Sequence, residues 1–312
     1  MQIYKYGKDV ISNPRGCVIT LGFFDGVHIA HRDLIEAARE AAQKDDIPFG
    51  IFTFTSESDI KSNSKRIYNT AEKLKIFEKI GVDFTVIAEF SSISHLSAEK
   101  FVKDVLIEGL NCKIAVAGFN FRYGKGALGN AETLSADMKA CDRECIIRKE
   151  MTLDGETVSA TLIRGLLSDG KIEKANKLLG SPYSIFGRVT HGNGQGKHLG
   201  FPTVNTEFKD ESVPLKHGVY RSAIQIEDRL YPAITNVGVC PTFEERKRHA
   251  ETYILDFKGD LYGKETTLYI LEFMREEKRF ETAEELKKQI IVDKNNAINR
   301  FGEKTWQELG LK

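Results

Sequence analysis

Long apolar runs and an excess of charge of either sign are both missing from this sequence of 312 residues. It has no run of about 18 apolar residues, the length that a membrane-spanning helix needs. Residues 1–16 lack the apolar segment of a secretory signal. Lys plus Arg total 45 and Asp plus Glu total 45, so a strongly basic surface for nucleic acid is not indicated. We therefore expect neither a membrane nor a nucleic acid as partner.

Cysteine is sparse, with five residues in the whole chain. An odd number argues against a complete disulfide framework, and the spacings match no zinc pattern. Without an export signal, we expect reduced thiols and a cytoplasmic protein. The residues are Cys17, Cys112, Cys141, Cys145 and Cys240.

The first half of the chain alternates short apolar runs with amphipathic segments. The apolar content of 41% and charged content of 29% are those of a globular protein. Strands that alternate with helices are typical of a parallel sheet with crossover helices, so we expect a Rossmann-like, doubly wound α/β domain. Thr70 and Ser97 are the expected N-caps of two helices. The expected strands are 17–23, 48–54, 84–87 and 113–118, and the expected helices are 31–44, 70–81 and 97–109.

The second half has a different pattern. From residue 183, short runs that alternate polar and apolar residues are separated by glycine and polar turns, as in antiparallel strands. Closure into a small β-barrel removes the exposed strand edges. An amphipathic helix begins near Ala283. The change of pattern falls between Gly170 and Pro182, which predicts domains 1–180 and 181–312.

Residues 22–34 (GFFDGVHIAHRDL) carry the most informative motif of the first half. They leave an expected strand and enter a helix, where ligands bind in doubly wound sheets. Gly22 and Gly26 permit a tight turn and the close approach of a phosphate. His28 and His31 lie three residues apart, so on the first helical turn both project to one side with the free N–H groups of the helix start. This arrangement favours a polyphosphate ligand.

The same turn resembles the H-x-x-H signature of the nucleotidyltransferase superfamily, and G-x-F-D-G-V-H-x-x-H resembles bacterial FAD synthetases more narrowly. Residues 118–130 (GFNFRYGKGALGN) are similar to that family's G-x-D-F-R-F-G segment, and residues 159–164 (SATLIR) to its S-S-T-x-I-R segment. The resemblance implies that Ser159 and Thr161 bind phosphate and that Arg164 neutralises the leaving pyrophosphate. The other nucleotide-binding residues that it implies are Gly22, Phe23, Asp25, Gly26, Gly118, Asn120 and Arg122.

The implied reaction is attack of a phosphate monoester on the α-phosphorus of ATP, with loss of pyrophosphate. The nucleophile is already an anion, so the reaction needs no strong base. Catalysis then consists of positioning and charge stabilisation, which His28, His31 and Arg164 would supply.

Residues 187–205 (GRVTHGNGQGKHLGFPTVN) carry the second motif. Its five glycines give a backbone whose N–H groups can surround phosphates. It is not a Walker A loop, because no GK[ST] closes it. It resembles the riboflavin kinase pattern G-x-V-x-x-G-x-x-x-G-x-x-L-G-x-P-T-x-N. The resemblance implies that Thr203 and Asn205 hold Mg²⁺, a cation that prefers hard oxygen ligands. It also implies nucleotide contacts at Gly187, Gly192, Gly196, Gly200 and Pro202.

A kinase also needs a group that takes the proton of the attacking hydroxyl. Residues 251–264 resemble the riboflavin kinase segment with the catalytic glutamate, which implies that Glu251 is the base. Glu251 would share a strand face with Tyr253 and Leu255, an unusual neighbourhood for a surface carboxylate. Residues 275–280 (REEKRF) look like a family segment near the flavin, which makes Arg275 and Phe280 flavin-side candidates.

The N-terminal half departs from the family pattern at several positions. Phe23 stands where Asn or Tyr is usual, Ala30 where Gly is usual, Asn120 replaces Asp, and Ala160 replaces Ser. Residues 53–59 also lack the family's proline-rich loop. These departures leave an alternative open: a riboflavin kinase with a degenerate or regulatory first domain.

The first interpretation is an enzyme that converts riboflavin and ATP to FMN at the second domain, and FMN and ATP to FAD at the first. Its substrates and products would be ATP, riboflavin, FMN and FAD, with Mg²⁺ as cofactor. We expect a monomer or a weak homo-oligomer. A third interpretation is a flavin or nucleotide sensor without turnover, which Glu251, Thr203 and Asn205 argue against.

Overall fold

The structure is a computed structural model, and it describes residues 1–55, 65–190, 196, 199–208, 211–241, 246–301 of the chain. Its contacts divide the chain into two compact units, Met1–Ala160 and Thr161–Lys312. The division falls ahead of the predicted boundary at residue 180. The residues between these two boundary positions include α7 (Ile172–Leu179), which belongs to the second unit. Its Asn176 side chain donates to Ile270 O and accepts from Tyr183 N in the same unit.

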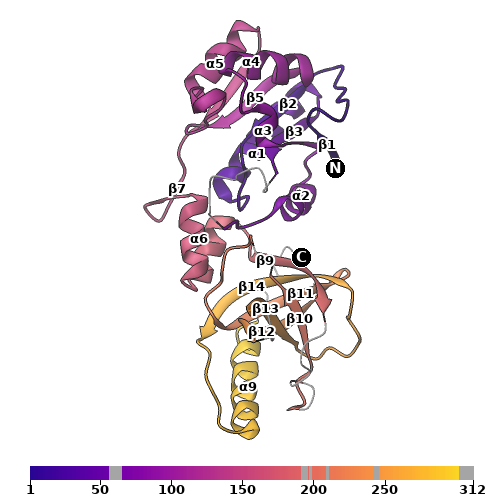
Figure 1. Ribbon diagram of the computed structural model, residues 1–312, viewed down its shortest axis with the longest axis vertical. Coiled ribbons are helices and arrows are strands. Elements are labelled where there is room, and N and C mark those ends of the chain that lie inside the picture. Colours follow the sequence, from indigo (N-terminus) through magenta and orange to yellow (C-terminus); the bar gives the residue numbers. More distant parts are fainter. Residues whose placement is uncertain (56–64, 191–195, 197–198, 209–210, 242–245, 302–312) are drawn as a thin grey trace. The chain divides into compact units, whose positions relative to one another are not determined.

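The first unit is a parallel six-stranded sheet in the order β1-β4-β3-β2-β5-β6, with helices packed around it (Figure 1). This confirms the doubly wound α/β fold. The central strands are buried along their length, as expected for strands covered on both faces. The strands are β1 (Gln2–Lys5), β2 (Cys17–Leu21), β3 (Phe49–Phe54), β4 (Phe84–Ala88), β5 (Cys112–Gly118) and β6 (Glu144–Arg148), followed by the hairpin β7 (Thr152–Leu153) and β8 (Glu156–Thr157).

Several helices of the first unit begin at side chains that cap free N–H groups. Ser97 caps its helix as predicted, accepting from Lys100 N at 3.2 Å. The prediction for Thr70 is wrong: Asn69 is the N-cap, because its side chain and that of Glu72 form a reciprocal capping box. The helices are α1 (Ile29–Asp45), α2 (Thr70–Lys79), α3 (Phe90–Ile93), α4 (Ala98–Lys100), the π-helical η2 (Phe101–Gly109), the 3₁₀ turn η3 (Lys125–Ala127) and α5 (Ala131–Ala140).

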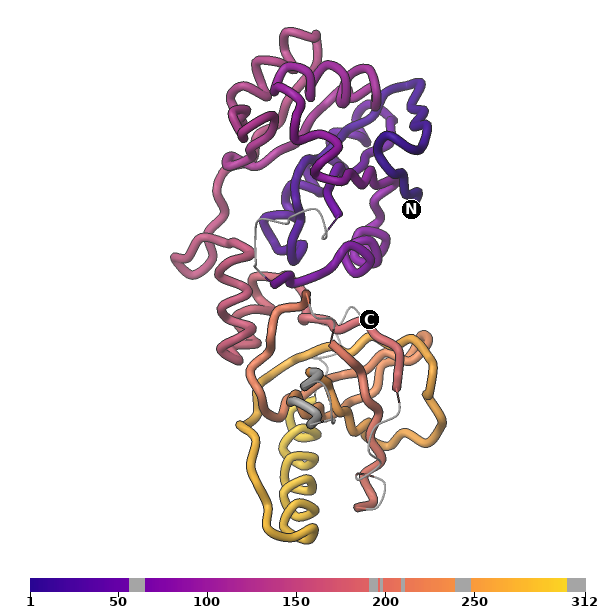
Figure 2. The backbone as a smooth tube through the Cα atoms, viewed as in Figure 1, coloured from indigo at the N-terminus to yellow at the C-terminus, as the bar shows by residue number. Residues whose placement is uncertain are grey.

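The second unit contains a closed antiparallel barrel in the strand order β10-β13-β12-β11-β14-β9. The barrel prediction is therefore confirmed. Figure 2 traces its strands in the orange part of the chain. Before the barrel come α6 (Ala160–Ser168), which begins at the unit division, and α7. The barrel strands are β9 (Tyr183–Thr190), β10 (Thr203–Glu207), β11 (Gly218–Ile226), β12 (Arg229–Pro241), β13 (Arg246–Ile254) and β14 (Glu265–Arg275), and the last helix is α9 (Ala283–Ile298).

A chain of hydroxyl groups crosses the barrel interior. The Thr235 hydroxyl is hydrogen bonded to those of Ser222 at 2.8 Å and Thr252 at 3.0 Å, and all three residues are fully buried. Because side chains alternate along a strand, the neighbours Glu251 and Asn236 point to the opposite, outer face. Apolar residues of α9 and the barrel, Ala297 and Ile234 among them, pack on this outer side.

Candidate active sites

The first site is built on a strained turn between β2 and α1. Phe24 and Val27 have positive φ angles of 56° and 44°, in the region that favours glycine, and Gly26 has 83°. Such angles persist only where the surroundings impose them, and for a β-branched valine they are rare. Phe24 and Val27 are completely buried, and Asp25 accepts hydrogen bonds from Ile67 N and Tyr68 N. Asp25, predicted to bind nucleotide, thus anchors the turn.

The two histidines face each other at the start of α1. Their rings stack with centroids 3.6 Å apart and an interplanar angle of 13°. His28 is the N-cap, and its Nδ1 accepts from His31 N at 3.4 Å. Since Nδ1 accepts, the neutral ring carries its proton on Nε2.

Burial decides the charge of this pair. It lowers the pKa of His28 to about 4. Burial also lowers the pKa of His31 well below its usual range, and the neighbouring His28 and Lys73 lower it further. Both imidazoles are therefore neutral at pH 7. Each ring can therefore offer a neutral N–H donor at pH 7, and neither carries a positive charge.

An aromatic cavity of about 670 Å³ lies in the first unit beside the end of β2. Of the predicted nucleotide residues, Gly22 and Arg122 line it, whereas Gly118 and Asn120 do not. Its wall includes Tyr123, whose hydroxyl donates to Asp137 Oδ2 at 3.1 Å and whose pKa is raised to about 12, mainly by burial. The motifs did not predict this cavity. Its lining also includes Leu21, Phe52, Phe54, Phe90, Ser91, Ile93, Ser94, Phe101, Phe121, Gly124, Gly126 and Ala127.

The predicted phosphate motif of residues 159–164 falls at the division between the units. Ser159 lies in the first unit, which ends at Ala160, and Thr161 and Arg164 belong to the part of α6 that lies in the second unit. Arg164 Nη2 donates to Thr161 Oγ1 at 3.1 Å, so these two side chains share one face of the helix. Their role toward phosphate stays a prediction.

The second site is a cavity of about 500 Å³ on the outer face of the barrel. Thr203 and Glu251 both line it, and Thr203 Oγ1 donates to Glu251 Oε1 at 2.8 Å. The strand register explains how residues far apart in sequence meet: Glu251 is directly opposite Asn205 on β10 and Asn236 on β12. Asn236 also lines the cavity. Residues 236–243 (NVGVCPTF) also resemble a segment of the riboflavin kinase family, but that resemblance assigned no role to Asn236; the pairing of β12 with β13 brings it to the site.

The glycines of the second motif have different structural roles. A Cβ on Gly196 would lie 2.4 Å from Phe201 O and 3.1 Å from Thr203 Oγ1, so a side chain there would displace the cavity wall. A Cβ on Gly187 would lie 2.4 Å from Thr206 Cγ2, so this glycine serves barrel packing. Gly200 has a φ of 86° and turns the chain toward the exposed Pro202. The predicted Gly192 lies outside the described residues.

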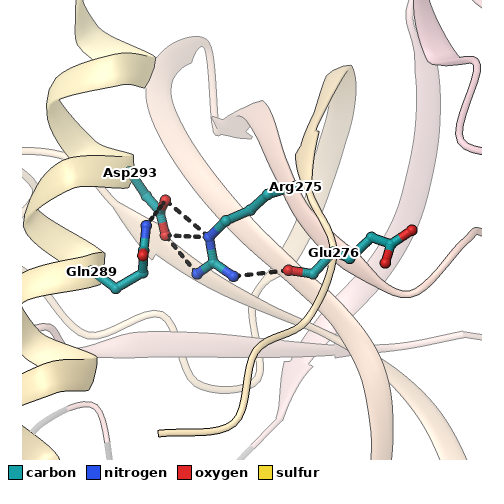
Figure 3. A network of polar contacts seen from close by, with 4 residues as sticks. All are labelled: Arg275, Glu276, Gln289 and Asp293. Atoms are coloured by element: carbon teal, nitrogen blue, oxygen red, sulfur yellow. Dashed lines mark hydrogen bonds and ion pairs between the residues drawn. The ribbon is translucent and has the colours of Figure 1, made fainter.

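The C-terminal helix forms the other wall of this cavity and is tied to the barrel by an ion pair. Arg275 Nη2 lies 2.7 Å from Asp293 Oδ2, and Arg275 Nε lies 3.0 Å from Asp293 Oδ1. Gln289 donates to the same carboxylate, and Arg275 Nη1 donates to Glu276 O (Figure 3). Arg275 and Phe280, the two flavin-side candidates from the sequence, both line this cavity. The guanidinium of Arg275, however, is already engaged in holding α9.

Together these features define a two-unit transferase: an α/β unit with a histidine pair at a helix start, and a barrel with a threonine–glutamate pair at a cavity. Comparison with known proteins gives the family. The family described as FAD synthetase matches residues 10–162, and that described as riboflavin kinase matches residues 179–301. The chain belongs to the bifunctional riboflavin kinase/FMN adenylyltransferase family.

The relatives match over nearly their whole length. The bifunctional riboflavin kinase/FMN adenylyltransferase of Escherichia coli (strain K12) is 32% identical over 293 residues, which cover 92% of this chain and 93% of that protein. The Bacillus subtilis (strain 168) protein of the same description is also 32% identical, with 91% and 92% covered. Because both domains are present, the chain carries both activities, and the kinase-only alternative is not supported.

A solved structure shares the complete fold. It is a protein from Streptococcus pneumoniae described as a macrolide-efflux protein, with 30% identity, a TM-score of 0.86, and coverage of 97% of this chain and 100% of that one. Among the residues described for our chain, none of the helices has the length and hydrophobicity to cross a membrane.

Proposed function

We propose that the two steps of FAD synthesis occur at the two sites described above, one at the barrel cavity and one at the histidine turn. Riboflavin is phosphorylated by ATP at the barrel cavity. FMN then attacks the α-phosphorus of a second ATP at the histidine turn, and pyrophosphate leaves. The observation that carries this proposal is the hydrogen-bonded pair Thr203–Glu251, facing a cavity of about 500 Å³.

In the kinase step, Glu251 is the general base. Its carboxylate accepts the proton of the terminal ribityl hydroxyl as that oxygen attacks the γ-phosphorus of ATP. General-base help of this kind is worth about 10²–10⁴-fold in rate. In the structure Thr203 donates to this carboxylate and holds it toward the cavity. Phe280 and the apolar side of the cavity offer a slot for the flat isoalloxazine ring.

The residues around Glu251 also fit Mg²⁺. Thr203 and Asn205 lie on the same face of β10, and a hydroxyl oxygen and an amide oxygen are the hard ligands that this cation takes. No cluster of three His, Cys, Asp or Glu side chains suited to a softer metal occurs in the described part of the chain. When bound, Mg²⁺ would neutralise charge on the ATP phosphates.

In the adenylyltransferase step, the neutral imidazoles of His28 and His31 donate to phosphate oxygens at the start of α1. The strained turn before them fixes their direction. Arg164 supplies positive charge for the leaving pyrophosphate. The aromatic cavity accepts the isoalloxazine ring of FMN, because its wall is built from phenylalanine and tyrosine rings.

The test uses the purified full-length chain with riboflavin, ATP and Mg²⁺, and separates the flavins by chromatography over time. We expect FMN to appear first and FAD to follow. FMN without FAD would overturn the adenylyltransferase half. Unchanged riboflavin would overturn the kinase half, and a second reaction started from supplied FMN then tests the adenylyltransferase half by itself.

We also propose a cytoplasmic enzyme that works as a monomer or a weak homo-oligomer. Four cysteines of the described chain, among them the buried Cys17 and Cys112, are free thiols, which suits a reducing compartment. Mass photometry from nanomolar to micromolar concentration tests the oligomeric state, and a tight oligomer at nanomolar concentration would contradict it.

A further inference from the structure

The histidine turn and the aromatic cavity meet where strands β2 and β3 separate. The backbone pairing between these strands ends with Gly22 N donating to Phe52 O at 3.3 Å. Beyond that point β2 continues into the turn with His28, and β3 ends at Phe54 in the cavity wall. The distance between the two binding regions therefore depends on what connects the strand ends there.

Two buried side chains make this connection. Thr53 Oγ1 donates to Phe23 O at 3.1 Å. Lys73, which reaches in from α2, donates to Phe23 O at 2.9 Å and to Phe54 O at 3.2 Å, and its ammonium lies 3.5 Å from Thr53 Oγ1. Thr53 and Lys73 are each 1% exposed. A charged donor to a carbonyl forms a stronger hydrogen bond than a neutral one, so these contacts hold both strand ends firmly.

The ring of Phe23 reinforces the same connection. Lys73 Nζ lies 4.6 Å from its centroid, and the ring stacks near that of Phe54 at 6.5 Å with an angle of 16°. A phenylalanine at position 23 thus suits the buried ammonium through a cation–π contact, which is strongest where the cation is desolvated.

We propose that Thr53 and Lys73 are positioning residues for adenylyl transfer, because they fix the histidine turn relative to the wall of the aromatic cavity. The proposal rests on the proposed function, in which ATP binds at the turn and FMN in the cavity. The attacking phosphate oxygen must then approach the α-phosphorus within a narrow range of distance and angle. A misplacement of about 1 Å is enough to reduce a rate about 100-fold.

This role differs from a catalytic one. The ammonium of Lys73 is buried and donates to two backbone carbonyl oxygens, so its contacts serve the connection between the strand ends. Loss of the connection should therefore change the placement of the two substrates relative to each other. The affinity for each substrate, measured separately, should stay the same. The kinase activity resides in the other unit and reports on the integrity of the same preparation.

The experiment compares Thr53→Val, which removes the hydroxyl donor, with Thr53→Ser, which keeps it. Thr20→Val is the matched control, because Thr20 is a fully buried threonine of the neighbouring strand whose hydroxyl makes no hydrogen bond within the described residues. We expect Thr53→Val to lower kcat for FAD formation about 10- to 100-fold. Dissociation constants for ATP alone and FMN alone, measured by calorimetry, should stay within about threefold of the parent values. Thr53→Ser and Thr20→Val should retain the parent kcat.

Lys73→Met and Lys73→Gln extend the test, since glutamine retains N–H donors and methionine does not. We expect a larger loss of kcat in Lys73→Met than in Lys73→Gln, with riboflavin phosphorylation unchanged in both. The proposal is overturned if Thr53→Val keeps the parent kcat, if its loss appears entirely in the affinity for one substrate, or if Thr20→Val loses as much. A parent chain that makes no FAD would instead refute the proposed function.

Discussion

Thr203 Oγ1 donates a 2.8 Å hydrogen bond to Glu251 Oε1, which joins the residue predicted to hold the metal to the residue predicted to take the proton. The two residues come from the antiparallel strands β10 and β13. Thr203 is paired with Tyr253, which lies two residues from Glu251 on the same face of β13. The proposed metal site and the proposed base are thus adjacent in one cavity. The hydrogen bond holds the Glu251 carboxylate in a fixed direction without any bound substrate.

The first prediction concerns the base. Glu251→Gln keeps the size of the side chain and can still accept from Thr203, but it cannot take a proton. We expect kcat for riboflavin phosphorylation to fall about 10²–10⁴-fold, while FAD formation from supplied FMN is retained. Glu207→Gln, at an exposed position of β10, is the control and should leave both rates unchanged. Equal activity in both variants would rule out Glu251 as the base.

The second prediction concerns Gly196, where a Cβ would lie 2.4 Å from Phe201 O. Gly196→Ala should raise KM for ATP and lower kcat of the kinase, because the wall beside Thr203 must shift. Gly165→Ala is the control, since a Cβ there meets no atom within 4 Å. Steady-state kinetics of FMN formation checks both variants, and an unaffected Gly196→Ala would show that the cavity wall adapts freely.

The third prediction concerns the link between Arg275 and Asp293. The carboxylate is buried and holds the guanidinium through two oxygens, so Asp293→Asn leaves a poorly compensated charge. We expect the second unit to lose about 3 kcal/mol of stability in urea unfolding, and KM for riboflavin to rise as α9 loosens. Arg275→Lys should act in the same direction, since lysine cannot form the two-pronged contact. Unchanged stability in Asp293→Asn would contradict this account of the helix.

The fourth prediction concerns pH. The pKa of His28 is about 4 in the folded chain against an ordinary value of 6.5, so the unfolded chain binds more protons between these values. The free energy of unfolding of the first unit should therefore decrease as the pH falls from 6.5 to 4, by about 3 kcal/mol from this residue. His31, whose pKa is also lowered, acts in the same direction.

Hydrogen–deuterium exchange of α1 measures this dependence locally. His28→Asn keeps an N-cap side chain but does not titrate, so its exchange should depend less steeply on pH than that of the parent chain. An identical pH dependence in both chains would show that His28 does not carry the effect.

The sequence predicted those features that lie within one contiguous segment. The strand–turn–helix with His28 and His31 and the Pro–Thr–x–Asn element with Thr203 could be recognised because neighbouring residues form each of them. The alternation along β13 likewise indicated that Glu251 shares a face with apolar residues. Even so, local propensity misplaced an N-cap at Thr70, because the reciprocal bonds of Asn69 and Glu72 favour a start one residue earlier.

The features that the sequence did not predict depend on long-range pairing. Asn236 reaches Glu251 only through the register of β12 and β13. The aromatic cavity draws on several separate segments between residues 21 and 127, none of which is distinctive alone. The contacts of Lys73 with Phe23 and Phe54 join α2 to two strands, and a lysine in an amphipathic helix is by default a surface residue.

The presence of two separate sites in one chain is tested most directly by mixing two full-length variants, each of which lacks one of the two activities. His28→Asn and Glu251→Gln are purified separately and then combined with riboflavin, ATP and Mg²⁺. Within the time in which the parent chain completes the reaction, each variant alone should yield little FAD from riboflavin: His28→Asn stops at FMN, and Glu251→Gln leaves most of the riboflavin unconverted. The mixture should produce FAD, because FMN released by one variant is adenylylated by the other. Loss of both activities in either single variant, with no FAD from the mixture, would contradict the assignment of the steps to separate sites.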